Sequence, residues 1–483
     1  MASSLLATDG YKFSMAEAGW PLRTETFYYS HRKGGAQVMP VDAGALVRAL
    51  LPEPTADDYA YLAAHEYGMG IGFQAAMVKR EGLVVRAVPK GAVFYPREPV
   101  LSATGPSALV SWLEPLLLQL SFRVQVATLG LADPAELARE VAVVTCPEQR
   151  DLVAETLEAV GVAAPPMKVD ADAYRERVRA RAAGLVEIVG DGGRIFEVGL
   201  RSASCLAQHR LALEGCLAAG VRRTSNVLGA KELGMVPVGT MGHEHVQRYG
   251  SDEAAFRAMR ERRPQRSSFL LDTYDTFRSG IPAAYELIAE SPQGGDSIRY
   301  DSGDKEAQYL FAVERARALG IRPVQILEDG FDDVATRRFE VLRAEVGWKP
   351  HEQFYGYGGY LVASTMGTRL TRDRVAAVYK LTQSGKTPTM KFANEAGSGK
   401  RSIPGRPVLF RRRTGNGPVG LVGQEGEQPP EGYFLLTGSG PEPVSTSFSA
   451  DARRAGEDAS LGFTPATQGL IDELEARAFG GKA

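Results

Sequence analysis

The stretch Ser297–Gly320 reads SIRYDSGDKEAQYLFAVERARALG, a short apolar run that continues into a charged, helix-like pattern. The same alternation recurs from Ile195 onward, with apolar runs in IFEVGLR, VRRTSNV, MVPVGTMGH, SFLLDTYDT, PVQILEDG and FYGYGGYLV. Strands and helices that alternate at this spacing are typical of parallel strands with helices packed outside them. We therefore expect an α/β barrel, and we find no fixed period that would favour a repeat solenoid.

The ends of these apolar runs carry polar residues and glycines. In a barrel of this kind the chemistry gathers where the strands end. The residues at those ends are Arg201, Ser225, His243, Asp272, Asp301, Asp329 and Gly358. Polar groups at so many successive strand ends favour a functional site over scattered surface polarity.

The segments outside the barrel divide the 483-residue chain into further parts. We expect an N-terminal α+β domain over 1–130, a mostly helical insert over 131–190, the barrel over 191–376, and a strand-rich C-terminal segment and tail over 377–483. The C-terminal segment returns to strand-like, glycine-rich sequence. We expect it to add to the N-terminal domain.

The composition excludes several classes of function. The formal net charge is −2, with 44% apolar and 24% charged residues, which argues against nucleic acid or an anionic membrane as the main partner. The three cysteines lack the spacing of a metal site and indicate free thiols in a reducing compartment. No signal peptide is visible, and the apolar stretch 112–122 reads as too short to span a bilayer. We expect a cytoplasmic enzyme.

His243 and His245 lie two residues apart in VPVGTMGHEHVQRYG, although the chain has only 6 histidines. Three interpretations are open. At a strand end both rings could bind a divalent metal, as in a metal-dependent amidohydrolase-like barrel. One histidine could instead be catalytic, with Asp272 accepting its N–H, or both could be solvated loop residues.

Anion-binding and metal-binding residues follow the later strands. Asp301 and Asp304 flank a turn that could hold Mg²⁺ or merely start a helix, and Arg299 alternates with Asp301. Glycine-rich turns can admit a phosphate or be plain tight turns. The candidate phosphate-binding residues are Gly330, Gly358 and Gly359 together with the cations Arg32, Arg372, Lys380, Lys391 and Lys400. The alternative interpretation is that each of these cations lies at a solvated position on the protein surface.

Taken together, these motifs resemble the nicotinate and nicotinamide phosphoribosyltransferase family, and within it the nicotinate branch. The resemblance covers about Leu6 to Arg411 and is interrupted around 134–190. The motifs that carry it are TDGYKFSM, FYYSHRKGG, VPKGAVFYPREPVL, GLRSAS, RTSNVLGAKELGMVPVGTMGH, LLDTYDTFRSG, IRYDSGD, YGYGGYLV and MKFANEAGSGKRSIPG. Their order and number make the match specific.

The resemblance implies an irregular α/β barrel of the type II phosphoribosyltransferases, working as a homodimer with sites between subunits. The implied reaction joins nicotinate to phosphoribosyl pyrophosphate, gives nicotinate mononucleotide and pyrophosphate in NAD biosynthesis, and is coupled to ATP hydrolysis with Mg²⁺. The alternatives are a nicotinamide phosphoribosyltransferase or the amidohydrolase-like barrel that uses His243 and His245.

The resemblance also assigns roles to residues. His243 is the histidine that ATP phosphorylates, Asp272 is its carboxylate partner, and Tyr11 stacks on the pyridine from the other subunit. Arg201 lies beneath the base, and Ser225 leaves Arg201 free to favour an anion. The other implied contacts are Arg299 and Asp301 to ribose and metal, Gly330, Gly358 and Gly359 to the 5′-phosphate, and Arg32, Arg372, Lys380, Lys391 and Lys400 to pyrophosphate or ATP. Glu244, where the family usually has serine, predicts repulsion of a phosphoryl group on His243.

Overall fold

The structure is a computed structural model that describes residues 4–392, 401–417, 419–438, 448–455 and 459–479. A sheet of parallel strands forms its centre, with the strand order β10-β9-β8-β14-β13-β12-β11. The strands are β8 (Ile195–Glu197), β9 (Arg223–Thr224), β10 (Val236–Pro237), β11 (Ser268–Leu270), β12 (Ser297–Tyr300), β13 (Val324–Leu327) and β14 (Gln353–Tyr357). The last strand, β14, pairs with the first, β8, so the sheet curls on itself. The predicted fold class, an irregular α/β barrel, is confirmed.

The helices that follow these strands cover the outside of the sheet. They are α11 (Leu206–Ala218), α12 (Val227–Leu233), α13 (His243–Tyr249), α14 (Asp252–Arg262), α15 (Ile281–Glu290), α16 (Lys305–Leu319) and α17 (Asp333–Glu345). The stretch that predicted the fold forms β12 and α16. Asp304 caps α16 by accepting from Ala307 N at 3.0 Å, and Gly320 ends it with φ of +69°. The buried side of α16, which includes Tyr309, Ala312 and Ala316, packs on the sheet.

A second sheet joins the two ends of the sequence. Its strand order is β16 (Thr387–Pro388), β15 (Ala377–Ser384), β1 (Thr24–His31), β5 (Leu101–Pro106) and β3 (Val84–Ala87). β1 pairs antiparallel with β15, so that Phe27 lies opposite Leu381 and Tyr29 opposite Tyr379. The segment after the barrel therefore adds to the N-terminal strands, as predicted.

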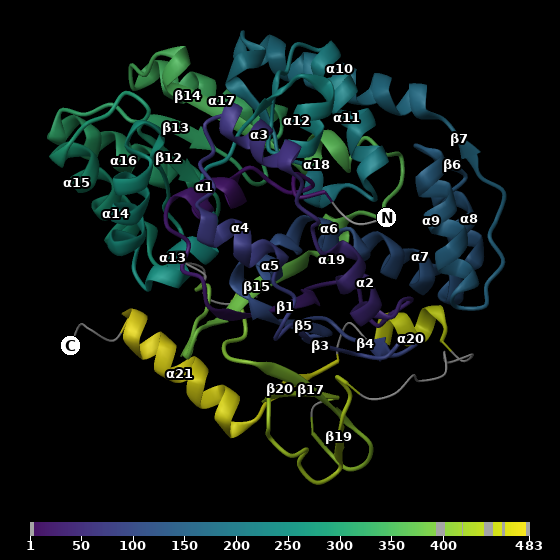
Figure 1. Ribbon diagram of the computed structural model, residues 1–483. Coiled ribbons are helices and arrows are strands. Elements are labelled where there is room, and N and C mark those ends of the chain that lie inside the picture. The colour runs from purple at the N-terminus through teal and green to yellow at the C-terminus, as the bar shows by residue number, and fades with distance from the viewer. Residues whose placement is uncertain (1–3, 393–400, 418, 439–447, 456–458, 480–483) are drawn as a thin grey trace.

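The rest of the C-terminal region forms a four-stranded sheet in the order β19 (Tyr433–Leu435), β17 (Pro407–Arg412), β18 (Gly420–Gln424) and β20 (Leu461–Phe463). Together with α21 (Pro465–Phe479) this sheet forms one end of the molecule (Figure 1). Two short pairs complete the strands, β2 (Gln37–Val38) with β4 (Val93–Phe94), and β6 (Val143–Val144) with β7 (Lys168–Val169).

The remaining helices belong mainly to the N-terminal region and the insert. They are α1 (Tyr11–Glu17), α2 (Ala43–Leu50), α3 (Ala56–Ala64), α4 (Ile71–Val78), α5 (Ser107–Trp112), α6 (Glu114–Leu118), α7 (Leu120–Ala132), α8 (Pro134–Glu140), α9 (Pro147–Glu158), α10 (Ala171–Val189), α18 (Gly359–Val362), α19 (Arg372–Val375) and α20 (Ala450–Ala455). The insert helix α10 packs against α11 and α17 of the barrel, while α9 packs against α7. The insert therefore lies on the outside of the barrel (Figure 1).

One segment is more extended than the sequence suggested. Helices α6 and α7 follow each other directly, and the 19 residues Glu114–Ala132 are long and apolar enough to cross a membrane. We expected this stretch to be too short to span a bilayer, and the helical length shows that this expectation was wrong. Of its most apolar window, 78% is buried inside the protein, and a buried core helix passes the same test of length and composition.

The N-terminal segment reaches across to the barrel. Asp9 forms an isolated bridge with Asn226, and Gly10 N donates to Ser225 O at 2.7 Å. The backbones of Gly10 and Gly239 touch, since a Cβ on Gly239 would lie 2.1 Å from the carbonyl carbon of Gly10. This close approach brings α1 to the carboxyl ends of β9 and β10.

Candidate active site

A cavity of about 500 Å³ opens at the carboxyl ends of the barrel strands. Most of the predicted site residues line it: Tyr11, Arg32, Arg201, His243, Arg299, Asp301, Gly330, Gly358, Gly359, Arg372, Lys380 and Lys391. Two described residues, Asp272 and Ser225, do not, and a third predicted residue cannot be placed. Asp272 lies behind His243, Ser225 is buried beneath Asp9, and Lys400 falls outside the described residues.

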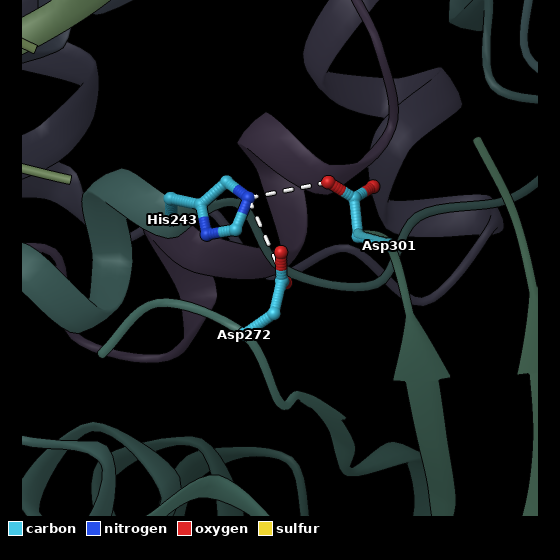
Figure 2. A group of neighbouring side chains, drawn as sticks. All are labelled: His243, Asp272 and Asp301. Atoms are coloured by element: carbon cyan, nitrogen blue, oxygen red, sulfur yellow. Dashed lines mark hydrogen bonds and ion pairs between the residues drawn. The ribbon is translucent and has the colours of Figure 1, made fainter. Parts of the chain in front are cut away.

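His243 begins α13 and is held by contacts at both ring nitrogens. Nδ1 lies 3.1 Å from Thr273 Oγ1, and Nε2 accepts from Lys391 Nζ at 2.8 Å. Nε2 also lies 3.3 Å from Asp301 Oδ2 (Figure 2). Burial and the Lys391 ammonium lower the pKa of His243, against the opposing effect of Asp272 and Asp301. This network assigns a neutral ring near pH 7, with Nδ1–H donating to Thr273 and the lone pair on Nε2.

The contact between Asp272 and His243 differs from the one expected. Asp272 Oδ1 lies 3.8 Å from Nε2, which is too far for a hydrogen bond (Figure 2). The other carboxylate oxygen of Asp272 accepts from Ser302 Oγ and from Lys391 Nζ, the latter at 3.3 Å. Thr273, the next residue along the chain, holds the ring instead. Sequence reasoning missed Thr273, although it follows Asp272 at the same strand end.

The carboxylates beside His243 form a possible metal site. Ligand atoms of His243, Asp272 and Asp301 all lie within 4.8 Å of one another. Asp272 Oδ1 is buried without a hydrogen-bond partner, and oxygen donors of this kind fit Mg²⁺. Burial alone would raise the pKa of Asp301, but Arg299 and His243 hold it well below its usual value. Asp304, the other carboxylate of this turn, caps α16.

The cavity also contains Tyr11 and Arg201. The Arg201 guanidinium lies 5.7 Å from the centre of the Tyr11 ring. Tyr11 lines the cavity of its own chain, whereas the resemblance implied a ring supplied by the other subunit. The physical reason is the bridge between Asp9 and Asn226, which fixes the start of α1 against its own barrel.

Arg201 is not free, contrary to the expectation from Ser225. Its Nε lies 3.2 Å from Asp9 Oδ2, and its Nη1 lies 4.0 Å from Glu114 Oε1. Ser225 Oγ donates to Asp9 Oδ1 at 2.6 Å, so this hydroxyl holds Asp9 rather than facing the cavity. Burial raises the pKa of Asp9, and Arg201 and Ser225 oppose the rise. Asp9 and Glu114 were missed because only the folded chain brings them to Arg201.

Glu244 lies beside the cavity but is held by other side chains. Its Oε1 lies 2.5 Å from Lys12 Nζ, and its Oε2 accepts from Ser111 Oγ at 2.7 Å and from Arg248 at 3.0 Å. Lys12 also lies 2.9 Å from Glu114, which accepts from the Tyr11 hydroxyl. Burial would raise the pKa of Glu244, but Lys12 and Arg248 lower it. The carboxylate that we expected to repel a phosphoryl group is therefore paired with two cations, which it shares with Glu114 and Glu25.

Cations and glycines line the rest of the cavity. Gly330 has φ of +72°, which favours glycine, and Gly359 lies against the Asp373 side chain. Burial lowers the pKa of Lys380 to about 8, against the attraction of Glu114. Lys380 and the neighbouring Arg32 and Arg372 could bind a polyphosphate here.

His245 is directed away from the cavity. Its Nε2 lies 3.2 Å from Ala255 O, its ring packs against Tyr249, and burial lowers its pKa to about 4. The expected pair of rings on one side required a strand end, whereas α13 begins at His243. On a helix, residues i and i+2 point about 200° apart. The metal clamp by His243 and His245 was wrong.

Comparison with known proteins points to one kind of enzyme. No family model matches the chain. Nicotinate phosphoribosyltransferase pncB2 of Mycobacterium tuberculosis is 29% identical over 267 residues, which cover 54% of this chain and 54% of that protein. Human nicotinate phosphoribosyltransferase is 26% identical over 349 residues, covering 68% of this chain and 60% of that protein.

Among solved structures, nicotinate phosphoribosyltransferase from Porphyromonas gingivalis matches with a TM-score of 0.58 at 19% identity. The match covers 83% of this chain and 96% of that one, and it shows a shared fold. These similarities confirm the resemblance that the motifs predict. The chain spans about half the length of the curated relatives it matches, 54% for the mycobacterial protein.

Proposed function

We propose that this relative of the nicotinate phosphoribosyltransferases joins nicotinate to phosphoribosyl pyrophosphate. The products are nicotinate mononucleotide and pyrophosphate, in a reaction coupled to ATP hydrolysis and serving NAD biosynthesis. We further propose that the protein acts in the cytoplasm as a homodimer, with no nucleic acid or membrane partner.

One observation supports this activity above the others. A single cavity brings together an aromatic ring with an arginine at one end, carboxylates beside a histidine, and several cations near glycine turns. The aromatic end suits a flat base, and the cationic wall suits a pyrophosphate. The amidohydrolase-like alternative needs His245 as a second metal ligand, but His245 is buried outside the cavity.

The sugar chemistry needs mainly electrostatic help. The bond between ribose C1 and the pyrophosphate oxygen breaks as positive charge grows on the sugar, and the pyridine nitrogen then bonds to C1. Arg32, Arg372 and Lys380 stabilise the charge on the departing pyrophosphate. Asp272 and Asp301 would hold Mg²⁺, which when bound neutralises further negative charge. Tyr11 and Arg201 hold the base for its attack.

ATP coupling is assigned to His243. Its neutral ring attacks the γ-phosphorus through Nε2, ADP leaves, and water later accepts the phosphoryl group. Lys391 Nζ, which lies 2.8 Å from Nε2, would move from the ring nitrogen to the phosphoryl oxygens during this step. Asp272 keeps Lys391 in place, since it lies 3.3 Å from the ammonium.

The test is to identify the product formed from each base. The full chain is incubated with phosphoribosyl pyrophosphate, ATP, Mg²⁺ and either nicotinate or nicotinamide, and the nucleotide is identified by mass spectrometry. We expect nicotinate mononucleotide, and we expect Asp301→Asn to make little of it. A product from nicotinamide alone would assign the alternative branch, and no nucleotide from either base would refute the proposal.

The charge beside Arg201 gives a sharper test of base choice. A carboxylate of the protein and the carboxylate of nicotinate would repel each other by about 4 kcal/mol if they lay about 4 Å apart at an effective dielectric constant of about 20. Ser225→Asp places a second carboxylate against Asp9, which pairs with Arg201, and it should weaken nicotinate use more than nicotinamide use. Asp9→Asn removes a carboxylate that competes with nicotinate for Arg201 and should act in the opposite direction. Competition kinetics in which both variants shift the preference the same way would contradict this.

A further inference from the structure

Two of the three cysteines meet where the helical insert touches the barrel. Cys146 Sγ and Cys205 Sγ lie 3.8 Å apart, although 59 residues separate them in the sequence. Cys146 is 3% exposed, Cys205 is half-buried, and both are free thiols. Since an S–S bond measures about 2.05 Å, the two sulfurs need to close by less than about 2 Å.

The two thiols lie at the N-terminal ends of two different helices. Cys146 precedes α9 and its Sγ accepts from Gln149 N at 3.4 Å, whereas Cys205 precedes α11. A helix N-terminus favours a thiolate over a thiol. The hydrogen bond from the Cys146 thiol lowers the pKa of Cys205, and the same bond raises the pKa of Cys146. Cys205 is thus the nucleophile of the pair, and Cys146 is the thiol beside it.

We propose that Cys146 and Cys205 form a reversible disulfide site that takes a low-molecular-weight disulfide as its oxidant. The half-buried Cys205 thiolate attacks one sulfur of the oxidant, forms a mixed disulfide and releases one thiolate. The Cys146 thiol then loses its proton and attacks Cys205 Sγ, which releases the second thiolate. The two protein thiols are oxidised to one disulfide, and the oxidant is reduced to two thiols.

This bond would tie the insert to the loop that carries part of the cavity wall. Cys205 lies just after Arg201 and Ser202, which both line the cavity, and Cys146 lies at the start of α9 in the insert. The insert, which the proposed reaction does not use, thereby gains a role as the partner of this loop. The site depends only on the thiol geometry and holds whether or not the proposed activity is correct.

The third cysteine supplies an internal control. Cys216 is fully buried on α11, and burial raises its pKa well above the usual value. It should therefore stay a free thiol under conditions that oxidise the other two. A matched pair of variants, Cys146→Ser and Cys205→Ser, separates the two steps of the exchange.

The experiment maps the thiols of the folded full chain after exposure to glutathione disulfide. Remaining thiols are alkylated, the protein is digested without reduction, and the peptides are identified by mass spectrometry. We expect a cross-linked peptide pair containing Cys146 and Cys205, alkylated Cys216, and reversal by dithiothreitol. Cys146→Ser should instead trap glutathione on Cys205, whereas Cys205→Ser should leave Cys146 largely unmodified.

Two outcomes would overturn the proposal. One is wild-type protein in which all three cysteines remain free after prolonged exposure. The other is wild-type protein that stops at glutathione on Cys205 without the internal link. Oxidised wild-type protein should also show a higher Tm than reduced protein, because the link constrains the unfolded chain. Wild-type mapping decides the matter even if a variant fails to fold.

Discussion

Replacing Lys12 by methionine would break the buried ion pairs that join α1 to α6 and to α13. Lys12 is fully buried, and its ammonium lies 2.9 Å from Glu114 and 2.5 Å from Glu244. Methionine keeps most of the side-chain volume, so the change removes the charge more than the packing. The two glutamates would stay buried with one cation fewer.

The expected loss of stability follows from the contacts that remain. Breaking a buried pair by removing one partner costs about 3–5 kcal/mol. Glu244 keeps Ser111 and Arg248, and Glu114 keeps the Tyr11 hydroxyl, so we expect the lower end, about 3 kcal/mol. This is a large part of the roughly 5–15 kcal/mol by which a folded protein is stable.

The effect should depend on pH in a defined direction. Burial would raise the pKa of Glu114 and of Glu244, but Lys12 and neighbouring cations hold both below the usual 4.5. A carboxylate whose pKa is lowered by folding stabilises the folded state at pH values above its usual pKa of about 4.5. This contribution is lost as the pH falls below that value. The difference between wild type and Lys12→Met should therefore be largest near neutral pH and shrink below about pH 4.5.

The assay is guanidinium unfolding of wild type, Lys12→Met, Glu244→Gln and the double variant. We expect the double variant to be less destabilised than the sum of the single changes, because both remove the same ion pair. Lys168→Met is the matched control, since that side chain is 72% exposed and should leave the midpoint unchanged. If Lys12→Met unfolds at the same midpoint as this control, the reasoning is refuted.

Three further predictions concern the proposed reaction. His243→Ala should abolish transfer of label from γ-labelled ATP to the protein, whereas His245→Asn should retain it; label on the His243 variant would exclude this carrier. Affinity for phosphoribosyl pyrophosphate, measured by calorimetry, should fall as the pH rises through about 8, where Lys380 loses its charge, and Lys380→Met should bind weakly without this pH dependence. Mixed dimers of Tyr11→Ala and Asp301→Ala chains should stay inactive, because one chain supplies both residues to its cavity; recovered activity would indicate shared sites.

The barrel and its site were largely predictable because both follow local patterns. The Ser297–Gly320 stretch contains its own strand, helix cap and terminating glycine, and α12 likewise begins at the Asn226 cap and ends at Gly234. Parallel strands bring their carboxyl ends to one edge, so listing strand-end residues was enough to collect Arg201, His243 and Asp301.

Side-chain direction and long-range pairing were not predictable in this way. Whether His245 faces the cavity depends on where α13 begins, and a shift from strand to helix reverses its direction. The pairs from Lys12 to Glu114 and to Glu244 join residues 102 and 232 positions apart. Nothing near Lys12 in the sequence reveals these partners. The same holds for Asp9 and Arg201, where only the folded N-terminal segment shows that the arginine is already paired.

The buried charges also bear on how Glu244 can follow His243, the histidine that we propose carries a phosphoryl group. An unpaired carboxylate at this position would repel the transferred group and favour its loss. Here Glu244 lies 2.5 Å from Lys12 and 3.0 Å from Arg248, and these cations, which also pair with Glu114 and Glu25, offset part of its field at the His243 ring. The same Lys12 contacts Glu114, which accepts from the Tyr11 hydroxyl. The ends of the cavity that would hold the base and the phosphoryl group therefore share one chain of ion pairs, and a change in Glu244 should disturb both.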